Sequence, residues 1–201
     1  KYQREGLYQN GRFPDNSLGK SEQLNFTNVG LKAGVTYKLT GRHLVDANVA
    51  YITNAPTIRN SFSNSRENNN VVDNLVSENV FSTDVSYIIR SPILTGRLTG
   101  YYNYTEDATE ISFYFADGVG GDNTAFVQEV LTGINKKHLG IEFGLEAQVT
   151  STIKLKGAAA IGQFTYDNNP NLYLTTDVVN EGVFDDKGRS QNYISNLENY
   201  K

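Results

Sequence analysis

The stretch LGIEFGLEAQVTSTIKLKGAAAI, residues 139–161, decides the fold. Its first arm alternates apolar residues such as Leu139 and Ile141 with polar residues and glycines. After the small polar turn at residues 150–152, the arm at 153–161 repeats the alternation. Successive side chains of a β-strand point to opposite faces, so a period of two predicts an antiparallel hairpin with one apolar face and one polar face.

Two further hairpins with the same alternation precede this one. The first joins residues 24–39 to residues 44–53, and the second joins residues 80–90 to residues 94–104. The alternation resumes at residues 111–115 with the opposite parity, which predicts a β-bulge near residues 106–109 or a strand that extends beyond a membrane. A short strand is also predicted at residues 172–179, whereas residues 1–23 and the rest of 167–201 have the composition of loops.

The connections between these strands are strongly asymmetric. The turns at Gly41, Pro92 and Ser151 are short, whereas the connection at residues 54–79 is long and rich in Asn and Ser. Short turns on one side and long polar loops on the other are typical of an outer-membrane β-barrel, while a soluble β-sandwich spreads its loop lengths more evenly. Tyrosines near both strand ends, such as Tyr37 and Tyr104, suit the aromatic girdles of such a barrel.

The predicted fold class is therefore all-β, an antiparallel transmembrane β-barrel segment. The three main hairpins supply six strands, fewer than the roughly eight that close the smallest barrels. We therefore expect residues 1–201 to be part of one larger barrel domain, with no plug domain in these residues.

Composition excludes several other classes. The net charge is −4 and the pI about 5.2, so the chain has no basic footprint for nucleic acid. There is no cysteine, so neither a disulfide nor a thiolate metal site is predicted. No apolar run is long enough for a transmembrane helix, and no G-x-S-x-G nucleophile elbow is present. We predict no catalytic residue, no metal site and no cofactor, and we expect that the chain is not an enzyme.

The predicted polar face carries many charged side chains. Glu142 and Glu146 share this face, and paired carboxylates can hydrolyse glycosides. Lys154 and Lys156 share it on the partner strand, however, so cross-strand ion pairing is the simpler explanation. We predict that this face lines the lumen of the barrel, where it would contact a plug, with these residues: Lys32, Asp46, Asp84, Arg97, Glu142, Glu146, Lys154 and Lys156.

The long loops hold the candidates for substrate binding, because rigid scaffolds commonly carry recognition residues on loops. Arg59 and Arg66 would meet an anionic ligand, and Phe62, with Tyr2 and Tyr8, would stack on a sugar or another ring. The alternative interpretation is that all of them are solvated loop residues.

Four stretches of the chain resemble a known family. They are REGLYQNGRFPDNSLGKSE (4–22), APTIRNSFSNSREN (55–68), SYIIRSPILTGRLTGYY (86–102) and FVQEVLTGINKKHLGIEFGLEAQ (126–148). In sequence, order and short-turn positions they resemble the C-terminal barrel of TonB-dependent outer-membrane receptors from Bacteroidetes, in the group with an N-terminal carboxypeptidase-regulatory-like domain.

The resemblance implies a 22-stranded barrel plugged by an N-terminal domain, a size that is characteristic of plugged outer-membrane transporters. Its function would be the import of a scarce nutrient such as a siderophore, metal complex, glycan or peptide. The implied partners are outer-membrane lipid and lipopolysaccharide, TonB–ExbB–ExbD acting through an N-terminal part, and a surface lipoprotein. The implied location is the bacterial outer membrane.

Two other functions share much of the pattern. A passive outer-membrane porin would have the same strands but no plug and no TonB box. A soluble carbohydrate-binding β-sandwich would bury its apolar faces against each other and remain monomeric without detergent.

Overall fold

The computed structural model describes residues 2–3, 20–63, 70–117 and 124–176. In this part of the chain the all-β, antiparallel fold is confirmed, with a single sheet of seven strands. The elements are β1 (Gly30–Lys38), β2 (His43–Asn54), the short 3₁₀ helix η1 (Arg59–Ser61), β3 (Glu78–Arg90), β4 (Leu94–Ala116), β5 (Ala125–Gln148), β6 (Lys154–Tyr166) and β7 (Asn171–Thr176).

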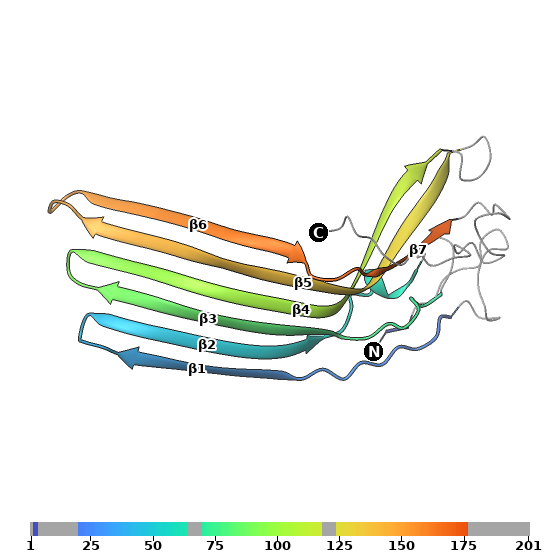
Figure 1. Cartoon of the computed structure of the whole chain (residues 1–201), viewed down its shortest axis with the longest axis horizontal. Helices are drawn as coiled ribbons and strands as arrows, with labels where there is room; N and C mark the ends of the chain where they lie inside the picture. Colours follow the sequence, from blue (N-terminus) through green and yellow to red (C-terminus); the bar gives the residue numbers. More distant parts are fainter. Residues whose placement is uncertain (1, 4–19, 64–69, 118–123, 177–201) are drawn as a thin grey trace.

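The strands lie in sequence order from β1 to β6, and each pairs antiparallel with the next. The strand β7 continues the edge formed by β6, because it pairs with the earlier part of β5. Figure 1 shows the three short turns together at one end of the sheet, and the long connections at the other. We call these the turn end and the loop end. Each turn is closed by a backbone hydrogen bond, for example from Ser91 N to Leu94 O at 2.7 Å.

The register gathers the apolar residues of six strands on one face. Directly opposed residues in antiparallel strands lie on the same side of a sheet, so each row of partners crosses from β1 to β6 on one face. We define the apolar face by the rows Tyr37–Val45–Tyr87–Leu98–Phe143–Ala159, Val35–Ala47–Val85–Gly100–Ile141–Ile161, Ala33–Val49–Thr83–Tyr102–Leu139–Gln163 and Leu31–Tyr51–Phe81–Tyr104–Lys137–Thr165.

Nothing in the described residues covers this apolar face. Leu31 is 69% exposed and Ile161 75% exposed, at opposite edges of the sheet. The named elements contact only their neighbours within the sheet, apart from η1, which contacts β4. The main sheet is therefore a single layer without a hydrophobic core of its own.

The buried core of the described residues lies at the loop end. One cluster joins Val72, in the connection before β3, to Val130 and Tyr173. A second cluster joins β4, β5 and β7 through the buried residues Ala108, Leu131, Ile134 and Leu172. The long loops and the ends of the strands thus form a small folded layer at the loop end of the single sheet.

The paired strands β4 and β5 bend between the main sheet and this layer. The register shifts between Thr105 and Ala108 and again between Ala108 and Glu110, which confirms the predicted bulge. Asp107 in β4 and Gly133 in β5 take positive φ values of 58° and 66°. Glycine adopts this conformation freely and aspartate tolerates it, so the sequence allows both strands to bend at the same level, as Figure 1 shows.

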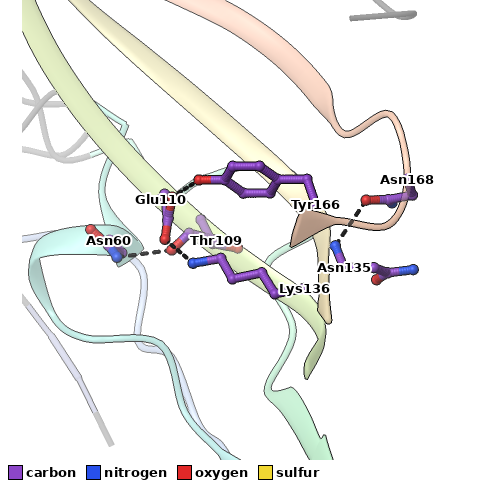
Figure 2. A network of polar contacts seen from close by, with 7 residues as sticks. All are labelled: Asn60, Thr109, Glu110, Asn135, Lys136, Tyr166 and Asn168. Atoms are coloured by element: carbon purple, nitrogen blue, oxygen red, sulfur yellow. Dashed lines mark hydrogen bonds and ion pairs between the residues drawn. The ribbon is translucent and has the colours of Figure 1, made fainter. Parts of the chain in front are cut away.

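Polar side chains hold the bend together, as Figure 2 shows. Asn168, which follows β6, accepts a hydrogen bond from Asn135 N at 2.9 Å and donates to Gly133 O at 2.6 Å. In the same region Lys136 forms an ion pair with Glu110, which also accepts a hydrogen bond from Tyr166. These contacts stabilise the bend, because they tie β4, β5 and the segment after β6 at one level.

Most strands begin or end a few residues from the predicted bounds, and the first and last strands differ as follows. The first strand, predicted at residues 24–39, begins only at Gly30. Val29 still accepts a backbone hydrogen bond from Thr53, but residues 24–27 lie beyond the end of β2 at Asn54. The predicted strand at 172–179 is β7, at Asn171–Thr176, and residues 177–179 lie outside the described residues. Most of the predicted loops 1–23 and 167–201 also lie outside them.

Candidate functional site

The second face of the sheet carries the charged residues singled out in the sequence. We call it the polar face and define it by the rows Thr36–Asp46–Ser86–Thr99–Glu142–Ala160, Gly34–Asn48–Asp84–Tyr101–Gly140–Gly162 and Lys32–Ala50–Ser82–Asn103–His138–Phe164, together with Arg97, Glu146, Lys154 and Lys156 near the turn end. The register thus places every predicted lumen-lining residue on one face.

A hydrogen-bonded cluster lies on the central strands of this face, toward the turn end. The Arg97 guanidinium donates to Ser86 Oγ from Nε at 3.1 Å and from Nη2 at 2.9 Å. The Ser86 and Thr99 hydroxyls lie 2.9 Å apart, so the cluster spans β3 and β4. Asp46 accepts a hydrogen bond from the Thr36 hydroxyl on the neighbouring strand. The polar groups of this face therefore satisfy one another across strands.

The two glutamates have different surroundings. Glu146 accepts from Lys154 at 2.7 Å and from Lys156 at 3.0 Å, which is the cross-strand ion pairing that the sequence favoured. The Glu142 carboxylate makes no hydrogen bond or ion pair with any described residue, although its backbone is paired within the sheet. Because Glu146 is engaged by two ammonium groups, the arrangement does not form the isolated pair of carboxylates that glycoside hydrolysis uses.

Glycines on the polar face allow larger side chains to lie flat against the sheet. A Cβ atom added to Gly140 or Gly162 would stand 2.6 Å or 2.8 Å from the Tyr101 hydroxyl oxygen. The Tyr101 ring therefore covers the backbone of both β5 and β6, an aromatic cover over glycine that stabilises sheets. Toward the β1 edge of the same face, the Asn48 side chain lies over Gly34 and donates to Asp84 Oδ1 at 3.1 Å.

Two hollows lie on the polar face. The larger, of about 990 Å³, lies over β3 to β6, and its lining includes Arg97, Glu142 and Phe164. Its floor is low because Gly144, Ala158 and Ala160 are small. The second, of about 620 Å³, lies over β1 to β4, and both hollows share Ser82, Asp84 and Asn103 in their linings. The polar face is therefore a hollowed surface with unpaired charge at Glu142.

The loop candidates separate in the structure. Arg59 is exposed on η1, with its guanidinium carbon 5.8 Å from the centroid of the Phe113 ring. Phe62 is only 1% exposed and forms a bridge with Val71, so it belongs to the core of the loop layer. The prediction that Phe62 stacks on a ligand is wrong for this structure, because the ring has no free face. Arg66 and Tyr8 lie outside the described residues.

Sequence reasoning missed an aromatic strip on the bent end of the β4–β5 hairpin. Phe113 and Phe115 are exposed, and their ring centroids lie 5.5 Å and 5.4 Å from that of Phe126. The alternation at residues 111–115 predicted a strand. It did not predict that the aromatic side chains are exposed, because this exposure follows from the bend that turns the segment away from the main sheet.

The described residues contain no cluster of His, Asp or Glu side chains that could hold a metal ion. Among the same residues, no helix has the length and apolar character needed to cross a membrane. His43 and His138 lie on opposite faces of the sheet, the former 2.6 Å from the Tyr87 hydroxyl and the latter edge-on to Phe164.

Comparison with known proteins leaves the family open. No protein family matches the chain, no curated protein matches it, and no solved structure matches it.

Proposed function

We propose that this chain forms part of the wall and the outer loops of an outer-membrane β-barrel, in a TonB-dependent transporter that imports a scarce nutrient. The observation that carries the proposal is the uncovered apolar face. Soluble monomers rarely expose a contiguous apolar patch of more than a few hundred Å², whereas this face extends across six strands. Lipid is the solvent in which such a face is stable.

The length of the strands supports a membrane-spanning wall. The strands β3 and β6 each have 13 residues, which at about 3.3 Å per residue reach roughly 40 Å. A tilt of about 40° reduces this to a height of roughly 30 Å, the thickness of the hydrocarbon core of a bilayer.

The edges of the sheet support a larger barrel. Among the described residues, β1 and β6 each have a partner strand along one side only. Unpaired backbone groups are costly in lipid, where only helices and closed barrels satisfy them. Further strands must therefore pair with both edges, in agreement with a barrel larger than six strands.

The polar face would then line the lumen, and the loop end would face outward. Substrate would be captured by the loop layer, and its release inward would follow rearrangement of a plug driven from the inner membrane through TonB. The hollowed wall around Arg97 and Glu142 would contact that plug. No covalent chemistry on the substrate is required. The assignment to a TonB-dependent importer rests on the resemblance of residues 4–22, 55–68, 86–102 and 126–148.

Planar lipid bilayers test the proposal with the complete protein. A plugged importer inserts into the bilayer but carries no steady ionic current, because the plug fills the lumen. A stable ohmic current from the complete protein would contradict the importer and support a passive porin. A protein that stays monomeric in buffer without detergent would contradict the membrane wall itself and support a soluble β-sandwich.

A further inference from the structure

Cationic side chains gather at the turn end of the polar face. The register of β2 and β3 continues one step past His43, because Arg90 N donates to Arg42 O at 2.8 Å. Two rows of partners at this end are Arg42–Arg90–Thr95–Glu146–Lys156 and Lys38–Leu44–Ile88–Arg97–Gly144–Ala158. We define the basic band by six cations, the five in these rows and one opposite Gln148: Lys38, Arg42, Arg90, Arg97, Lys156 and Lys154.

The basic band has too few carboxylates to neutralise it. Glu146 is the only acidic residue of the two rows, and it is already engaged by the ammonium groups of the two lysines on β6. The side chains of Lys38, Arg42 and Arg90 make no hydrogen bond or ion pair with any described residue. Arg97 donates to a neutral hydroxyl group. Because like charges directly opposed across a ladder destabilise a sheet, the band calls for an anionic partner.

Acidic residues lie in the next two rows toward the loop end. Asp46 and Glu142 share the first of these rows, and Asp84 lies in the second. Neighbouring rows on one face are two residues apart, so the charge changes sign within about 7 Å along the strands. A small anion that entered from the loop end would be repelled by these carboxylates before it reached the cations. The segregation of charge therefore favours a partner that stays at the turn end over a solute that passes through.

The basic band is wide enough for an extended polypeptide segment. It runs from β1 to β6, which is five strand spacings of about 4.8 Å, or roughly 24 Å. Side chains on one face of an extended segment are about 7 Å apart, so three or four carboxylates at alternate positions would span the band. Gly144 and Ala158 share the row of Arg97, and their small size leaves room for the backbone of such a segment.

We propose that the basic band holds an acidic segment of the plug domain at the turn end of the lumen, an inference that rests on the plugged barrel proposed above. The segment carries Asp or Glu at alternate positions. Its carboxylates pair with the Lys38 ammonium and with the guanidinium groups of Arg42 and Arg90. A guanidinium group binds a carboxylate through two parallel hydrogen bonds, so these contacts fix the position of the segment as well as its charge. They also neutralise two arginines that face each other on adjacent strands.

Carbodiimide crosslinking of the complete protein in detergent tests this contact. The reagent joins a lysine amine to a carboxylate that touches it. Lys38 is the informative amine, because the two lysines on β6 already touch Glu146. Mass spectrometry should find Lys38 joined to an Asp or Glu of the plug. Lys38→Arg keeps the charge but lacks the reactive amine, so this product should be lost. Products that join Lys38 to barrel residues alone, or no product at all, would overturn the proposal.

Charge reversal tests whether the contact holds the plug in place. Urea that unfolds the plug opens the lumen, so the current through a planar bilayer reports the release of the plug. The double substitution Arg42→Glu and Arg90→Glu should lower the urea concentration at which current appears by about 1 M, as expected when two exposed ion pairs become repulsions. The matched control, Arg42→Lys with Arg90→Lys, keeps both charges and should leave this concentration close to that of the unaltered protein.

A charge swap completes the test. Replacing the crosslinked plug carboxylate by lysine should restore the urea threshold of the charge-reversed protein, and failure to restore it would count against the contact. A charge-reversed protein with lower uptake but an unchanged threshold would assign the band to an anionic substrate and overturn the proposal. A steady current from the unaltered protein without urea refutes the plugged barrel itself. A closed protein in which neither Lys38 crosslinking nor charge reversal reports a plug contact refutes the acidic segment alone.

Discussion

Replacing Ile141 by arginine should destabilise the protein strongly in lipid. Ile141 lies on the apolar face, about half exposed, in the row that contains Gly100. In the proposed orientation its side chain points into the hydrocarbon near the middle of the wall. The neighbouring residue Glu142 points to the polar face, so Glu142→Arg adds the same side chain on the opposite side of the sheet.

The expected magnitude depends on the depth of the side chain. Ile141 lies four residues from Lys137 at the loop end of the wall and seven from Gln148 at the turn end. Arginine near the bilayer midplane of a membrane barrel costs about 2–4 kcal/mol. A surface substitution in water usually changes stability by about 0.5 kcal/mol or less. The loss of stability expected for Ile141→Arg is therefore several times larger if residue 141 faces lipid than if it faces water.

The assay is guanidinium unfolding of the complete protein in phospholipid vesicles. The loss of β-structure is followed by circular dichroism. We expect Ile141→Arg to lower the free energy of unfolding by about 2–4 kcal/mol, and Glu142→Arg to change it little. Equal, small effects of the two substitutions would refute the reasoning, because they would mean that Ile141 faces water.

Three further substitutions test individual contacts. Asn168→Ala removes the hydrogen bonds to Asn135 N and Gly133 O, so amide hydrogen exchange should accelerate in β7 but not in the main sheet. An equal change of the exchange rate in β7 and the main sheet would contradict the role of this residue at the bend. Tyr101→Ala uncovers Gly140 and Gly162 and should cost about 1 kcal/mol in the same unfolding titration, whereas unchanged stability would show that the ring adds nothing. Arg97→Glu removes the donor to Ser86 from the polar face, and it should weaken plug packing and lower uptake by the complete transporter; normal packing and uptake would exclude a plug contact at Arg97.

The hairpins and their two faces were predictable, because an alternation of apolar and polar residues with a period of two shows which side chains share a face. The predicted bulge followed from a change of parity between residues 104 and 111. These are local signals, and the sheet preserves them because each strand pairs with its neighbour in sequence.

The loop layer was not predictable from the same signals. Its core joins Val72 to Val130 of β5 and Tyr173 of β7, which are far away in sequence, and no periodic pattern marks them. The polar contacts at the bend likewise depend on Asn135 and Asn168, which resemble ordinary loop residues. The loss of the β1 ladder before Val29 depended on where β2 ends, a property of the partner strand and not of residues 24–27.

The central claim is that the apolar face contacts lipid and the polar face does not. Single cysteines can be introduced one at a time from Ser82 to Val85, in a version of the complete protein that has no other cysteine, and labelled with a fluorophore. Quenching by nitroxide-labelled lipids should be strong at 83 and 85 and weak at 82 and 84. Quenching without this period of two, or equally weak quenching at all four positions, would contradict the account.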